Sequence, residues 1–240
     1  MQKDINHMVS WCQRMGVELN DQKVHLLHIG QSNNKRHYTL GEGGPQIQVV
    51  EQEKDLGVLI SNDLKPDKMV AHQAQKAHAK LSQFNSTFTY VKPSLIYACE
   101  AWRPTSKDGV DKLESVQKRA VRMAGEQGDY KEACRRMGMN TIQDELDEAD
   151  MVRTFRIMNG HNKVERTTFW KMAEARVGPG RRRFCEKEIV RTVAAHKKAV
   201  KKRSFSARVQ DPWNQLADKV KIARNLRSFR LAYKKAKPLA

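Results

Sequence analysis

Apolar residues recur at the spacing of an α-helix through most of the chain after residue 66. From Asp67 to Phe88 they follow one another at every third or fourth position, as the residues of one continuous helix face do: Val70, Ala74, Ala77, Leu81, Phe84 and Phe88. Similar patterns predict helices over 107–124, 142–158 and 226–235, and a shorter helix over 130–137. The chain is therefore expected to be mainly helical.

Local signals predict where some of these helices begin and end. Thr141 and Asp144 form a capping-box pattern just ahead of the apolar residues that follow them. Pro93 is expected to separate the helix that ends at Phe88 from a second one at 94–102, because proline lacks the backbone donor that a helix interior requires.

The first 66 residues alternate between short elements. A helix is expected over 4–16, and strand patterns follow it at 23–29, 37–40, 46–50 and 55–60. We expect the last three strands to form a small antiparallel sheet. Gly57, in the middle of the last strand, indicates a place where another backbone comes close. The predicted fold class is α+β, mainly α, with this sheet near the N-terminus.

The helix predicted at 142–158 carries a cluster of five acidic residues near its N-terminus: Asp144, Glu145, Asp147, Glu148 and Asp150. Negative charge at this end of a helix is favoured by the helix dipole. A solvated helix face is therefore the expected role of the cluster, and no metal or acid–base site is inferred from it.

The cysteines Cys12, Cys99, Cys134 and Cys185 lie far apart and include no Cys-x-x-Cys pair. This spacing favours isolated, buried thiols over a zinc site or a disulfide framework. We therefore expect no metal ligands and a reducing compartment, the nucleus or the cytoplasm.

Charge is the most informative property of the composition. The net charge is +18, and residues 171–240 carry 21 of the 45 Lys and Arg residues but only 5 of the 27 Asp and Glu residues. Such a balance favours a polyanionic partner, either nucleic acid or an anionic membrane surface. No apolar run reaches the roughly 18 residues that a membrane span needs, and no secretory signal is recognisable. We expect no membrane partner.

These patterns divide the chain into three segments. Residues 1–66 form an α/β segment, 67–176 a helical bundle, and 177–240 a basic C-terminal region that is expected to bind nucleic acid.

Six segments, in order, resemble the reverse transcriptase (RNA-directed DNA polymerase) of LINE-type, non-LTR retrotransposons, a class of transposable element. The match is closest to the jockey-like branch, in the part that follows the active site. The matching segments are DINHMVSW from Asp4, the stretch from Gly16 to Gly30, EKDLGVLIS from Glu53, the stretch from Val91 to Trp102, LESVQKRA from Leu113, and SFSARVQDPWNQL from Ser204. Together they cover nearly the whole chain.

The resemblance implies a role for several residues. Asp55, Leu56, Gly57 and Val58 would belong to a primer-grip hairpin, in which the glycine lets the backbone approach a primer end. Asn20 and Lys23 look like the motif usually lettered D, whose lysine sits near the nucleotide triphosphate. The helical bundle would be a thumb-like domain followed by a basic helical tail.

The chain also departs from the family in ways that bear on activity. No Tyr/Phe-x-Asp-Asp occurs in it, and the family needs those aspartates to hold two Mg²⁺ ions for polymerisation. The endonuclease domain is absent, the family usually has more residues ahead of Val91-Lys92-Pro93, and Lys92 and Ile96 stand where the family has Arg and Glu. No catalytic residues, no cofactor and no polymerase activity of the chain alone are expected.

The favoured hypothesis is a non-catalytic fragment that binds RNA or DNA through phosphate contacts, without sequence readout. The residues expected to supply these contacts are Arg181, Arg182, Arg183, Lys197, Lys198, Lys201, Lys202, Arg203 and Arg208. One alternative is a domesticated structural protein that docks in a ribonucleoprotein or protein assembly. Others are a polymerase completed in trans by a separate palm-containing chain, and a relic reading frame without function.

Overall fold

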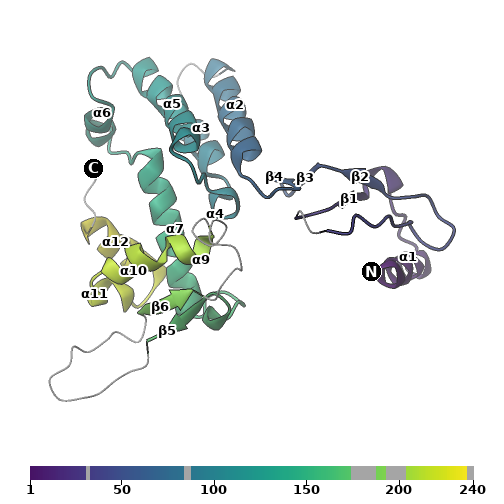
Figure 1. Ribbon diagram of the computed structural model, residues 1–240. Coiled ribbons are helices and arrows are strands. Elements are labelled where there is room, and N and C mark those ends of the chain that lie inside the picture. The colour runs from purple at the N-terminus through teal and green to yellow at the C-terminus, as the bar shows by residue number, and fades with distance from the viewer. Residues whose placement is uncertain (31–32, 84–87, 174–187, 193–203, 237–240) are drawn as a thin grey trace, which may run out of the picture. The chain divides into compact units, whose positions relative to one another are not determined.

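The computed structural model describes residues 1–30, 33–83, 88–173, 188–192 and 204–236 (Figure 1). The chain divides into two compact units, Met1–His72 and Gln73–Ala240. Their architecture is α+β and mainly helical, as expected. In the described part of the chain, no helix is long and apolar enough to cross a bilayer.

The first unit begins with helix α1, Gln2–Arg14. It starts two residues earlier than expected, so Asp4 lies in its first turn. Gly16, with φ of +68°, takes the left-handed conformation just past the helix end, and the N–H of Val17 donates to the carbonyl of Cys12 at 2.9 Å. This is the Schellman arrangement that the glycine makes possible. A short 3₁₀ turn, η1, follows at Asp21–Lys23.

The strands of the first unit do not form one antiparallel sheet. Strand β1, His25–Leu27, pairs in parallel with β2, Gln48–Val50. Of the strand expected at 37–40, only one antiparallel bridge is present, between Thr39 and Gln46. A separate antiparallel hairpin joins β3, Gln52–Asp55, to β4, Val58–Ser61. Antiparallel pairing near the N-terminus is thus present, but in the β3–β4 hairpin and in the single bridge between 37–40 and 46–50, and not as the expected sheet of three strands.

The turn of that hairpin corrects the strand expected at 55–60. Leu56 and Gly57 have φ of +46° and +84°, so they form a two-residue turn in which both residues have positive φ. Such turns match the twist of the flanking strands, and glycine is favoured in them because it has no side chain. Gly57 therefore lies at the tip of a hairpin instead of in the middle of a strand.

Helix α2, Asp67–Gln83, spans the junction of the two units. The apolar face predicted for it is buried at Val70, Ala74, Ala77 and Leu81. The expected break at Pro93 is wrong, because helix α3, Phe88–Ile96, contains this proline. The chain breaks later, at Ala98, whose φ of +50° separates α3 from the short helix α4, Cys99–Trp102.

Three further helices agree with the sequence pattern. They are α5, Lys107–Met123, α6, Tyr130–Arg136, and α7, Ile142–Met158. The predicted pair of capping residues begins α7: Asp144 N–H donates to Thr141 Oγ1 at 3.2 Å, and that hydroxyl donates to the Asp144 carboxylate at 2.7 Å. Helix α7 contacts α3, α4, α5 and α12, so it is the central helix of the second unit.

The C-terminal elements pack on the second half of α7 (Figure 1). After the 3₁₀ turn η2, Arg166–Thr168, strand β5, Trp170–Met172, pairs with β6, Ile189–Thr192, in antiparallel fashion. Four helices follow: α9 at Phe205–Arg208, α10 at Gln210–Gln215, α11 at Asp218–Lys221 and α12 at Leu226–Ala236. The last helix was expected, whereas the strand at 189–192 was not.

An aromatic core joins these elements to α7. The rings of Phe155 on α7 and Phe229 on α12 stack with centroids 4.4 Å apart, and Trp213 on α10 lies 6.1 Å from Phe229. Trp170 on β5 is also fully buried and donates its indole N–H to the Ser206 carbonyl at 2.8 Å. Aromatic pairs of this kind contribute beyond the area they bury, so the segment from 204 to 236 is firmly held on α7.

Candidate nucleic-acid interface

The residues predicted for a primer grip lie together at the tip of the β3–β4 hairpin. Asp55 and Val58 are the last paired residues before the turn, and Leu56 and Gly57 form the turn. Leu56 is 85% exposed. A leucine in a left-handed conformation costs about 1–2 kcal/mol relative to glycine. Because its side chain is exposed, Leu56 gains little from burial to offset this cost.

The two residues predicted for motif D lie on a different element. Asn20 precedes the η1 turn and Lys23 ends it, and both side chains are exposed. The sequence spacing therefore corresponds to a single 3₁₀ turn.

Most of the basic residues predicted to contact phosphates lie outside the described residues: Arg181, Arg182, Arg183, Lys197, Lys198, Lys201, Lys202 and Arg203. Arg208 is described, and it ends helix α9. Its guanidinium is directed at a carboxylate inside the protein, which the sequence did not indicate.

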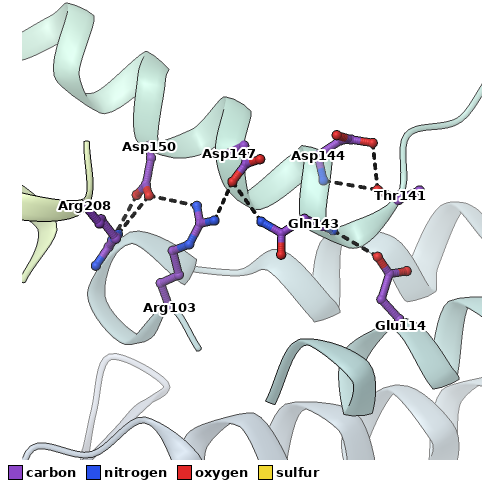
Figure 2. A network of polar contacts seen from close by, with 8 residues as sticks. All are labelled: Arg103, Glu114, Thr141, Gln143, Asp144, Asp147, Asp150 and Arg208. Carbon is purple, nitrogen blue, oxygen red and sulfur yellow. Dashed lines mark hydrogen bonds and ion pairs between the residues drawn. The ribbon is translucent and has the colours of Figure 1, made fainter. Parts of the chain in front are cut away.

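That carboxylate is Asp150, which is 4% exposed and lies on α7 (Figure 2). Arg208 donates from Nε and Nη2 to its two oxygens at 2.8 and 2.9 Å. Arg103, in the loop between α4 and α5, donates from Nη1 to the same carboxylate at 2.8 Å. Two cations thus share one buried anion, and both are themselves partly buried.

The network continues along α7 toward its N-terminus (Figure 2). Arg103 also bonds to Asp147, which accepts a further hydrogen bond of 2.9 Å from the Gln143 amide. The backbone N–H of Gln143 donates to Glu114 on α5 at 3.1 Å, and Tyr130 on α6 donates its hydroxyl to the same carboxylate. Burial and this hydrogen bond raise the pKa of Tyr130 well above its ordinary value.

The other two acids of the cluster that bind basic side chains also point toward other elements. Glu145 forms an ion pair with Lys92 on α3. Glu148 lies 3.8 Å from Arg230 and 3.7 Å from Lys234, both on α12. The expectation of a solvated acidic face is therefore wrong for α7, because four of its five acids are partly or fully buried against basic residues from four other segments.

One signal in the sequence could have shown that Asp150 is buried. Asp150 lies between Ala149 and Met151 on a helix whose apolar residues occupy more than one face. A carboxylate surrounded in this way is buried with the helix, and a buried charge requires a partner.

The surface of α11 and α12 is basic and exposed, whereas the acids of α7 are partly or fully buried. Six of its basic residues are exposed: Lys219, Arg224, Arg227, Arg230, Lys234 and Lys235. Asp218 is the only acidic residue between positions 218 and 236. Among the described residues, no carboxylate lies within ion-pair distance of Arg224, Arg227 or Lys235.

A cleft of about 510 Å³ opens between α5, α6 and the start of α7. Lys107, Lys118 and Lys131 line it, together with Arg103, which is bound to the α7 carboxylates. Three acids line it as well, Asp111, Glu114 and Asp144. Since these charges offset one another, the cleft has no strong preference for a polyanion.

The described residues include no group of three or more His, Cys, Asp or Glu side chains placed to hold a metal ion. Cys12, Cys99 and Cys134 are buried and free. Burial, with a smaller contribution from Glu100, raises the pKa of the Cys99 thiol to about 12. Burial also raises the pKa of the Cys134 thiol, so the thiols of Cys99 and Cys134 are neutral and poorly reactive in the folded protein.

Comparison of the chain with protein-family models, with curated proteins and with solved structures finds no match.

Proposed function

We propose that the chain binds RNA or DNA through phosphate contacts, without reading sequence and without catalysing a reaction by itself. In this proposal it corresponds to the post-active-site part of a LINE-type reverse transcriptase, with a primer-grip-like hairpin, a thumb-like helical bundle and a basic C-terminal region. The binding surface belongs mainly to the C-terminal region.

The observation that carries the proposal is the separation of charge in the second unit. The acids of α7 are turned into the protein, where Asp147 and Asp150 bind Arg103 and Arg208. They therefore offset specific internal cations, and the exposed basic residues of α11 and α12 remain available to a partner. Phosphate contacts of such residues gain affinity by releasing counterions from the nucleic acid.

The β3–β4 hairpin gives independent support. Its tip exposes Leu56 at positive φ, a backbone conformation that costs stability and that occurs often at sites of ligand contact. Gly57 beside it has no side chain to keep another backbone away. A sugar-phosphate chain lying across this tip would use both properties.

The buried carboxylates of α7 do not fit a polymerase centre. Two-metal catalysis needs acidic residues that are free to bind Mg²⁺, whereas Asp147 and Asp150 are bound to arginines in a buried network. Polymerase activity would require a separate palm-containing chain as partner. Primer extension with the chain alone is expected to give no product, and product formed by the purified chain would contradict this part of the proposal.

Binding itself is tested by fluorescence anisotropy with labelled single-stranded RNA, DNA duplex and RNA–DNA hybrid, each in two scrambled sequences. We expect binding in every case and equal dissociation constants for the two sequences of each kind. A large preference for one sequence, or no binding to any probe, would contradict the proposal.

A protein-interaction function is the second candidate, and one observation favours it. Met8, Trp11 and Met15 lie on one side of α1 and are all exposed. Trp213 and the apolar face of α2 offer no such surface, because Trp213, Val70, Ala74, Ala77 and Leu81 are buried within the chain. Sedimentation velocity of wild type and of Trp11→Gln tests this candidate: self-association that the substitution abolishes would favour it, and a monomer in both cases would disfavour self-association through α1.

A further inference from the structure

Helix α12 has two faces with different partners. Phe229 and Tyr233 face the core, where Phe229 stacks on Phe155 of α7 and lies 6.1 Å from the Tyr233 ring. Because these rings fix the rotation of the helix, the residues on the opposite side are held outward in a set pattern.

The outward side carries a row of uncommitted cations. Arg227 and Lys235 lie on one face of the helix with Leu231 midway between them, and all three are exposed; Arg224, two residues ahead of the helix, is exposed as well. Residues four positions apart follow one another along a helix at about 6 Å, on a single face. The cations of the row can therefore meet one phosphate backbone together.

A second row lies between this side and the core. Arg230 and Lys234 are 53% and 58% exposed, and they approach Glu148 of α7, which is only 13% exposed. The separations of 3.8 and 3.7 Å are long for ion pairs, and exposed pairs are worth little. Glu148 thus orients two cations that are still accessible to solvent.

From this arrangement, we propose that the outward side of α12 is the surface that contacts the nucleic-acid backbone, and that Glu148 competes with phosphate for Arg230 and Lys234. The inference rests on the proposed function and assigns its principal surface. A phosphodiester can replace the distant carboxylate at both cations without moving the helix. Glu148 therefore lowers the affinity of a surface that it also helps to order.

Two variants with matched controls test the inference on the full chain, with a short labelled DNA duplex as the probe. Arg227→Gln with Lys235→Gln removes two contacts of the outward row and should reduce the slope of log K against log salt by about 1.8. The control is Lys112→Gln with Arg119→Gln, two exposed cations on α5, which should leave the slope unchanged.

Glu148→Gln should tighten binding by about threefold, because it removes a competing carboxylate. Its control is Glu132→Gln on α6, which removes an equal charge from the weak pair with Arg136 and should leave the affinity unchanged. If Glu148→Gln weakens binding, or if the α5 pair reduces the slope as much as the α12 pair, the inference is wrong.

A measurement on the unaltered protein guards against misfolded variants. Acetylation of lysines, followed by mass spectrometry, should show Lys234 and Lys235 protected by the duplex and Lys112 unprotected. Equal protection of all three would overturn the inference while leaving nucleic-acid binding intact. Failure of the wild-type chain to bind any oligonucleotide would overturn the proposed function as well.

Discussion

Arg208 lies 58 positions after Asp150 in the sequence, and its guanidinium donates to both oxygens of that carboxylate, at 2.8 and 2.9 Å. This bidentate contact ties α9 to the central helix α7, and Arg103 ties the loop after α4 to one of the same oxygens, Asp150 Oδ2. Charge-assisted, two-point contacts of this kind fix orientation as well as adding energy. The basic C-terminal region is thus attached to α7 through one of its own cations, Arg208.

Asp150→Asn is expected to destabilise the protein strongly. It leaves two partly buried guanidinium groups without their shared counter-charge, and breaking a buried ion pair costs about 3–5 kcal/mol. Urea unfolding followed by circular dichroism measures the change. The matched substitution Asp111→Asn, at an exposed position on α5, should change the free energy of unfolding by less than about 0.5 kcal/mol. Equal free energies of unfolding for the two variants would show that the Asp150 network does not stabilise the fold.

Arg208→Gln separates folding from binding. Because the guanidinium is bound to Asp150, its loss should lower the free energy of unfolding while leaving the salt dependence of nucleic-acid binding unchanged. Anisotropy titrations at several salt concentrations, on the variant that is still folded, measure the second quantity. A slope that falls by about one would restore Arg208 to the set of phosphate contacts.

The buried thiol of Cys99 makes stability depend on pH in the alkaline range. In the unfolded chain the thiol has its ordinary pKa of 9.0, whereas burial raises the pKa in the folded protein to about 12. The unfolded state therefore loses this proton first, so the contribution of Cys99 is fully present below pH 9 and is lost as the pH rises toward 12. The free energy of unfolding of Cys99→Ala should fall less steeply than that of wild type across this window. Parallel curves would contradict the burial of the thiol.

The hairpin tip contains Leu56, whose positive φ lowers the stability of the folded protein. Leu56→Asn should stabilise the protein by up to about 1 kcal/mol, because asparagine followed by glycine is favoured in a turn where both residues have positive φ. Thermal unfolding measures the gain. If Leu56 contacts a bound strand, the same variant binds an RNA–DNA hybrid more weakly than wild type. A variant that is both more stable and unchanged in binding would remove the hairpin from the interface.

The sequence predicted the elements whose signals are local. The capping residue Thr141, the glycine at position 16 and the apolar periodicity of α5 and α7 each depend on residues a few positions apart, and each prediction is confirmed. Gly57 shows the limit of such signals: a glycine between apolar residues fits both a strand interior and a turn, and only the pairing of Asp55 with Val58 decides between them.

Elements that depend on distant partners were missed. The parallel pairing of β1 with β2 joins segments more than twenty residues apart, and strand β6 exists because β5 pairs with it. The α7 carboxylates could be seen in the sequence, but their cations lie 47 and 58 positions away for Asp150. No pattern along the chain reveals such partners. The assignment of Arg208 to a phosphate-binding set followed from composition alone, which cannot distinguish an internal cation from an external one.

The salt dependence of binding by the wild-type chain shows whether its basic residues contact phosphates. Dissociation constants for a short DNA duplex are measured by anisotropy over a series of salt concentrations, and log K is plotted against log salt. If about five basic residues meet phosphates, the slope should be near −4.5. A slope near zero would mean that charge does not drive binding, and would contradict the proposal that the exposed basic residues of this chain hold a nucleic-acid backbone.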